Sequence, residues 1–392
     1  MKKAFLTVTF LLMAALVFSA CGKKEDAEEK ETVKIGAVFA VTGGASFLGE
    51  PEKRTVEMLV EEINAKGGID GRKIELIIED DQANPDKTKA AVKKLILRDN
   101  VVAIIGPSTS GSSMAIKTIM NDEKVPLVSC AAAEVIVTPI DSAKWVFKVP
   151  QTDADCARRI YECMNELGLK KAGLMTANTG FGGAGREQLK KLAPEYGIEI
   201  VGDETYAGDA SDVKVELQKL KDAGAEAVIN WTIQPIQAKI AGQMKDIDFG
   251  AQLFQSHGYG NIKYAKEGGE AAEGTIFPAG RLLIADLLPE DHPQKKVLVK
   301  YKNDYEKKYK ENVSTFGGHA YDALMLVVDA IDEVGADRAK IRDYLETRNG
   351  DKAFVGTGGV FNISTEDHCG LDKNAFELIT VKDSKFVPYE KE

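Results

Sequence analysis

The chain has 392 residues, of which 44% are hydrophobic and 29% charged, and this length and composition predict a globular protein with two domains. The mean hydropathy of −0.20 is too low for a protein that crosses a membrane several times. The net charge of −10 argues against nucleic acid as a partner, because a phosphate backbone requires concentrated Lys and Arg.

The N-terminus has the pattern of an exported lipoprotein. A positive start, "MKK", precedes the apolar stretch "AFLTVTFLLMAALVF", and "VFSAC" follows in the manner of a lipobox. We expect residues 1–20 to be a signal peptide, Cys21 to carry the lipid, and residues 21–32 to be a flexible tether. An ordinary signal peptide with a chance cysteine is the alternative. The mature protein is expected in the cell envelope, anchored by lipid outside the cytoplasmic membrane.

From residue 33 onward, β-branched strand patterns alternate with amphipathic helix patterns. The first run contains "VKIGAVFAV", "KIELIIED" and "VVAIIG", and a second begins after "WVFKVPQTD" with "KKAGLMTAN", "IEIVGDETY" and "AEAVINW". Such alternation is typical of parallel sheets covered by helices. Residues 293–348 have mainly helical patterns, and two late strand patterns, "AFVGTGGVFNI" and "AFELITV", follow them. The fold class predicted is therefore α/β, with two doubly wound, Rossmann-like lobes.

Five hydroxyls and two glycines lie at one predicted strand-to-helix junction, "IIGPSTSGSSMAI", residues 104–116. The strand is expected to end at Gly106 and the helix to begin near Ser112. Backbone N–H groups at a helix start favour an anion, and the hydroxyls can donate to a carboxylate. A single N-cap with tolerated neighbours is the plainer interpretation. Capping requires one hydroxyl, so we favour a cradle for a carboxylate in the cleft where the two lobes face each other.

Other chemical motifs are weaker. "GFGGAG", residues 180–185, matches a dinucleotide-binding G-x-G-x-x-G, with Asp203 at the end of the next strand. An exported protein lacks access to a dissociable nicotinamide, so a dehydrogenase is a minority hypothesis, and glycines also suit tight turns. The four histidines show no paired metal-ligand spacing, and each is expected to be a surface or hydrogen-bonded residue. We predict no enzyme, no cofactor and no metal.

Four cysteines follow Cys21. Cys156 and Cys163 are about 10 Å apart along a helix, too far for a disulfide bridge. No pair has zinc-site spacing, so buried free thiols are expected. A disulfide between Cys130 and Cys369 stays open at this point.

Several segments resemble one family of binding proteins: "VKIGAVFAVTGGASFLGE", "INAKGGIDGRKIEL", "VVAIIGPSTSGSSMAI", "VPLVSCAAA" and "EAAEGTIFPA". They are similar to the branched-chain amino acid (leucine/isoleucine/valine) binding proteins of ATP-driven (ABC) importers. The resemblance implies a type I periplasmic-binding fold with three hinge crossovers. It implies a first lobe of residues 33–149 plus 279–352 and a second of residues 150–278 plus 353–392.

The resemblance also implies where a ligand would bind. The serine and backbone N–H groups that hold the ligand's carboxylate correspond to Ser110 and Gly111, and Ala131 offers further backbone contacts. Ala133 stands where the family usually has threonine. Phe47 corresponds to an aromatic residue of the first loop.

The second-lobe side of the implied site departs from the family pattern. Phe181 replaces a tyrosine, and His257 falls where an acidic residue receives the ligand's ammonium. Trp231 and Tyr259 are expected to extend the apolar lining.

The predicted function is that of a solute-binding lipoprotein of an ABC importer, whose partners are a permease and an ATPase. The ligand expected is a small carboxylate, first a branched-chain or other hydrophobic amino acid. Aromatic or other amine-free carboxylates are the alternative, since the carboxylate side of the site matches the family and the ammonium side does not. A sensory receptor subunit with the same lobes is a more distant alternative.

Overall fold

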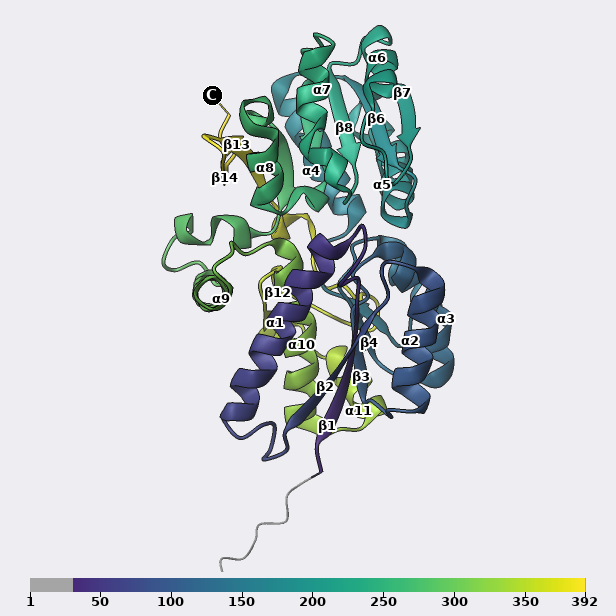
Figure 1. Ribbon diagram of the computed structural model, residues 1–392, viewed down its shortest axis with the longest axis vertical. Coiled ribbons are helices and arrows are strands. Elements are labelled where there is room, and N and C mark those ends of the chain that lie inside the picture. Colours follow the sequence, from purple (N-terminus) through teal and green to yellow (C-terminus); the bar gives the residue numbers. More distant parts are fainter. Residues whose placement is uncertain (1–30, 392) are drawn as a thin grey trace, which may run out of the picture.

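The computed structural model describes residues 31–391 and shows two α/β lobes stacked along the long axis of the molecule (Figure 1). This confirms the fold class predicted from the alternating patterns. The predicted signal peptide and the Cys21 lipidation site lie outside the described residues. None of the described helices is long and apolar enough to cross a membrane.

The first lobe contains a parallel sheet with the strand order β2-β1-β3-β4-β5. Its strands are rich in Val and Ile, and most of them are buried because helices cover both faces. The five strands are β1 (Val33–Phe39), β2 (Ile74–Asp80), β3 (Ala103–Ile105), β4 (Leu127–Ser129) and β5 (Val146–Lys148).

Helices α1 and α10 lie on one side of this sheet and α2 and α3 on the other, while α9 and α11 lie at the periphery (Figure 1). The six helices are α1 (Ser46–Ala65), α2 (Pro85–Leu97), α3 (Ser110–Glu123), α9 (Lys295–Tyr309), α10 (Thr315–Val334) and α11 (Arg338–Leu345).

The second lobe has a mixed sheet with the order β14-β13-β10-β9-β8-β6-β7, in which β13 pairs antiparallel to both neighbours. Its strands are β6 (Lys171–Ala177), β7 (Glu199–Tyr206), β8 (Ala227–Trp231), β9 (Gln252–Gln255), β10 (Ile276–Ala279), β13 (Glu377–Lys382) and β14 (Lys385–Pro388). Its helices are α4 (Asp153–Leu167), α5 (Gly180–Leu192), α6 (Lys214–Asp222), α7 (Ile240–Asp246) and α8 (Ile262–Gly268).

The chain passes between the lobes three times: after β5, after β10 and before β13. Gln151, in the first crossing, links it to the third, because its Nε2 donates to Gly358 O at 2.8 Å and to Ala375 O at 3.3 Å. The crossings therefore form a connected hinge.

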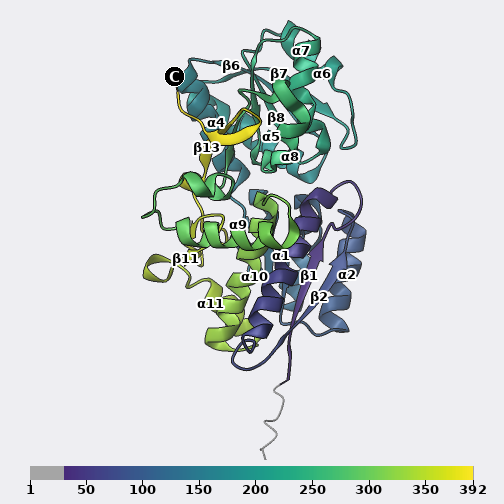
Figure 2. The ribbon, with the colours of Figure 1, turned by 60° about the vertical axis from the view of Figure 1, so that its left-hand side comes forward.

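The third crossing falls later than the expected boundary at residue 353. β11 (Phe354–Val355) and β12 (Val360–Phe361) form a small hairpin, and Phe361, Ile363 and Cys369 are buried in the core of the first lobe. Figure 2 shows β11 beside the first lobe and β13 on the second.

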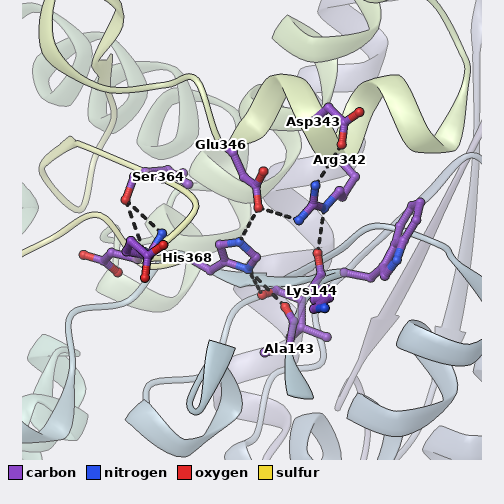
Figure 3. A network of polar contacts seen from close by, with 12 residues as sticks. Ala143, Lys144, Arg342, Asp343, Glu346, Ser364 and His368 are labelled. Carbon is purple, nitrogen blue, oxygen red and sulfur yellow. Dashed lines mark hydrogen bonds and ion pairs between the residues drawn. The ribbon is translucent and has the colours of Figure 1, made fainter. Parts of the chain in front are cut away.

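The polar contacts of two buried side chains, Asp322 and His368, explain why this segment stays with the first lobe. Asp322 of α10 accepts hydrogen bonds from Gly358 N at 2.7 Å and Thr357 Oγ1 at 3.0 Å. His368 places Nδ1 2.9 Å from Val146 O and Nε2 3.0 Å from the Glu346 carboxylate (Figure 3). Leaving these groups unpaired in the core would be costly, so they fix residues 354–370 to the first lobe.

The four described cysteines are free and buried, which confirms the expectation of free thiols; Cys130 and Cys369 form no disulfide. Burial raises the pKa of the Cys130 thiol well above its usual value, so it has little thiolate character.

Candidate functional site

A small, partly open cavity lies between the lobes. Its free volume is about 20 Å³, room for about one water molecule, so the lobes lie close together here. Residues of both lobes line it, and those of the first lobe include the start of α10. The lining residues are Leu48, Ser108, Thr109, Ser110, Cys130, Ala131, Ala132, Phe181, Ile233, His257, Gly258, Phe316 and His319.

The start of α3 forms one wall of the cavity. The chain turns after β3 at Gly106, whose φ of +86° and close approach to Val38 O leave no room for a side chain. Thr109 is the N-cap and accepts from Ser112 N at 3.4 Å. The helix therefore begins at Ser110, two residues earlier than expected, and its free N–H groups favour an anion.

Three serines of this stretch form hydrogen bonds within the first lobe, which sets them apart from Ser110. Ser112 accepts from Thr88 Oγ1 at 2.9 Å, and the Ser113 and Ser129 hydroxyls are 2.8 Å apart, so both serines support the lobe. Ser108 is engaged as well, because its hydroxyl donates to buried Glu52.

Ser110 differs from its neighbours. It is buried in the cavity wall, and its Oγ accepts from Ala133 N at 3.3 Å. Its O–H hydrogen remains available to donate. Because Thr109 caps the helix, Ser110 is available for a ligand oxygen rather than for capping.

The N-termini of α3 and α5 meet across the cleft. A Cβ on Gly180 would lie 2.8 Å from Gly111 N and 2.9 Å from Gly111 Cα. Backbone from the first lobe thus touches backbone from the second, and closure requires glycine at this contact.

The glycine motif of α5 serves packing at its other positions. A Cβ on Gly185 would clash with the Trp231 ring, and one on Gly182 with Ala177 O. Asp203 is the residue that would bind the ribose in a dinucleotide site. Here its carboxylate forms ion pairs with Arg186 at 2.6 Å and with Lys190 at 2.8 Å. Close packing and an ion pair therefore account for the residues that resemble a dinucleotide fingerprint.

Two histidines line the cavity, and both are more than nine-tenths buried: His257 is 6% exposed and His319 is 8% exposed. Among the described residues, neither ring nitrogen of His257 has a hydrogen-bond partner, and Nδ1 of His319 has none. Burial, and then the charge of nearby Lys148, lowers the pKa of His257 well below its usual value. The same two causes lower the pKa of His319 to about 3. Both rings are neutral at physiological pH.

Aromatic rings hold His257 in place. Its ring centroid lies 5.2 Å from that of Phe181, 5.7 Å from that of Trp231 and 5.5 Å from that of Phe376, each in an edge-to-face arrangement. Three rings thus fix the orientation of a polar side chain whose nitrogens have no protein partner.

Four of the predicted site residues line the cavity: Ser110, Ala131, Phe181 and His257. Their contact with a ligand stays a prediction. Trp231 does not reach the cavity but packs behind Phe181, with ring centroids 5.8 Å apart.

The other predicted residues lie elsewhere. Gly111 is in the contact between the lobes. Ala133 is in the first-lobe core, and its backbone N–H donates to Ser110 Oγ. Phe47 packs between the lobes, 5.9 Å from the ring of Tyr264. Tyr259 is in a separate cluster with Phe277 and Phe386, so the geometry gives no support to ligand contact by Tyr259.

The sequence argument missed His319 and Phe316, which reach the cavity from the first turns of α10. Ser314 caps this helix, with its side chain accepting from Gly317 N. A signal was present, since "STFGGHA" repeats the arrangement of hydroxyls and small residues found at the start of α3.

No Asp or Glu is among the described residues that line the cavity. Glu134, three residues after Ala131, accepts from Gln188 Nε2 at 3.0 Å and is absent from the lining. The charge that acts on both histidines is the buried cation Lys148.

The comparisons agree with this two-lobed architecture. A family model described as "Periplasmic binding protein" matches residues 32–375. The leucine-, isoleucine-, valine-, threonine- and alanine-binding protein of Pseudomonas aeruginosa is 25% identical over 342 residues, which cover 85% of this chain and 88% of the relative.

Solved structures are similar over nearly the whole chain. An extracellular ligand-binding receptor from Rhodopseudomonas palustris HaA2 superposes with a TM-score of 0.85 at 27% identity, covering 91% of this chain and 99% of that one. The branched-chain amino acid transporter substrate-binding protein of Streptococcus pneumoniae, solved with isoleucine, has a TM-score of 0.78 at 24% identity and covers 91% and 97%.

The chain belongs to the periplasmic binding protein family, and the relatives that it matches include proteins named as Leu/Ile/Val-binding proteins. It is an extracytoplasmic ligand-binding protein, and its relatives are solute-binding proteins rather than enzymes.

Proposed function

We propose that the protein is the solute-binding component of an ABC importer and delivers a small carboxylate with an apolar body to a permease and its ATPase. Cys21 would carry the lipid that holds it outside the cytoplasmic membrane. The observation that carries the proposal is the unused O–H of Ser110 at the start of α3, inside a cavity between two lobes.

The cavity walls suit such a ligand. The carboxylate would accept from the Ser110 hydroxyl and from N–H groups at the start of α3. Leu48, Ile233 and Phe316 would cover the apolar body. The lobes would close on the ligand through the contact between Gly111 and Gly180.

Two ligand classes are candidates. A branched-chain or other hydrophobic amino acid is supported by the name of the Pseudomonas aeruginosa relative. An amine-free carboxylate is supported by the cavity, because no acidic residue among those described lines it and the charge of Lys148 acts on His257.

Ser110→Ala tests the proposal. It removes a hydrogen bond to a charged oxygen, worth about 1.5 to 3 kcal/mol, and should weaken binding about tenfold or more. The ligand is found first by a thermal-shift screen of small carboxylates, and affinity is then measured by calorimetry. The exposed Ser211→Ala, outside the cavity, is the control and should bind as the wild type does. Unchanged affinity in Ser110→Ala with lower thermal stability would show a structural role only.

A further inference from the structure

His257 and His319 are polar groups that the closed protein leaves without partners. Three of their four ring nitrogens, His257 Nδ1 and Nε2 and His319 Nδ1, are buried and make no hydrogen bond to any residue in the range 31–391. Leaving a buried donor or acceptor unpaired costs free energy, so a structure retains one where something else supplies the partner. Both side chains line the cavity in which the ligand is proposed to bind.

The chemistry of the missing partner follows from the state of the rings. Burial and the charge of Lys148 keep His257 neutral, so its ring offers one N–H donor and one acceptor nitrogen. A ligand ammonium would bring a positive charge into a cavity whose described lining holds no carboxylate to balance it. An uncharged oxygen can accept from the N–H, or a hydroxyl can donate to the acceptor nitrogen, at no such cost.

We propose that His257 and His319 recognise an uncharged polar oxygen of the ligand, a hydroxyl or keto group, and that the preferred ligands are therefore amine-free hydroxy- or oxo-carboxylates with an apolar body. This inference rests on the proposed function and names the ligand class for the same cavity. The carboxylate would be held at Ser110, and the second oxygen would lie at the histidine wall.

The oxygen can be next to the carboxylate or further away, as in a ring hydroxyl. Ser110 and His257 line the same cavity, so one ligand can meet both side chains through neighbouring oxygens. The aromatic rings of Phe181 and Phe316 suit a planar ligand as well. Two series of probes separate these cases.

The experiment is calorimetry on the full chain. The first series has one carbon skeleton: 4-methylpentanoate, its 2-hydroxy and 2-oxo derivatives, and leucine. The second compares benzoate with 4-hydroxybenzoate. In at least one series the oxygenated acid should bind at least about tenfold more tightly than its parent, equivalent to about 1.4 kcal/mol. Leucine should bind more weakly than its 2-hydroxy analogue.

His257→Phe is the informative variant, because phenylalanine keeps the edge-to-face packing and removes both nitrogens. It should abolish the preference for the oxygenated acid and leave the affinity for the parent acid equal or tighter. His292→Ala, a histidine outside the cavity, should keep the wild-type preference. A variant that fails to fold would not bind the parent acid either. Retained binding of the parent acid therefore serves as the folding control.

The outcomes separate the inference from the proposed function. Tighter binding of leucine than of its 2-hydroxy analogue, or equal binding of oxygenated and parent acids in both series, would overturn the inference and leave a carboxylate-binding protein. Absence of binding by every carboxylate of both series would overturn the inference and the proposed function together.

Discussion

The contact between Gly111 and Gly180 allows closure of the lobes to be tested by a substitution at Gly180, which does not line the cavity. In Gly180→Ala the new Cβ would lie 2.8 Å from Gly111 N, where ordinary van der Waals contact needs 3.4 Å or more. Because the obstacle is backbone, the lobes must separate at this point by about 0.6 Å. Overpacking of this kind costs about 1 to 3 kcal/mol, so apparent ligand affinity should fall about fivefold to 150-fold.

Folding of the variant should not suffer. Gly180 follows the N-cap Thr179 at the start of α5, where alanine is a better helix former than glycine. Gly183→Ala is the matched control, since it lies in the same helix and its Cβ would have nothing within 4 Å. It should bind ligand as the wild type does.

The assays are calorimetry for affinity and small-angle X-ray scattering for closure. Gly180→Ala should bind weakly and remain more open with ligand, while Gly183→Ala compacts fully. Wild-type affinity and full compaction in Gly180→Ala would refute the claim that this contact limits closure.

Two further predictions concern pH and the anchor. Burial raises the pKa of Asp153 to about 6, against about 3.9 when unfolded, so its contribution to stability falls as pH rises from about 4 to 6. Asp153→Asn keeps an acceptor for Glu134 N and should flatten the pH dependence by up to about 2 kcal/mol in urea unfolding at pH 4.5 and 7; an unchanged slope would contradict the burial argument. Cys21→Ser should move the protein from the detergent phase to the aqueous phase or leave it unprocessed, whereas a wild type already in the aqueous phase would refute the lipid anchor.

Much of the fold could be predicted because its signals are local. Buried parallel strands such as "VVAIIG" have runs of Val and Ile between turn residues, and these runs alternate with helix patterns. The boundary at residue 353 could not be found in this way. "AFVGTGGVFNI" has the same strand pattern as "AFELITV", and the lobe that it joins is decided by Asp322 and His368, whose partners are distant in sequence.

The candidate site was predictable where one loop carries the signal. Ser110 and Ala131 follow strands of the first sheet, and the carboxyl ends of such strands face the cleft. Tyr259 was predicted to line the same site, but it lies two residues beyond His257 in a short 3₁₀ turn, where neighbouring side chains point in different directions, and it packs in a separate cluster. His319 required the knowledge of which face of α10 meets the cleft, and this depends on how α10 packs against α1.

The central claim is that a ligand carboxylate binds between the lobes at the start of α3. A crystal structure of the protein with the tightest carboxylate from the screen tests it most directly. The account predicts a carboxylate oxygen about 2.7 Å from Ser110 Oγ, with the rest of the ligand enclosed by Phe181, His257 and Phe316. A ligand that binds elsewhere, or that lies between the lobes with its carboxylate away from Ser110, would contradict it.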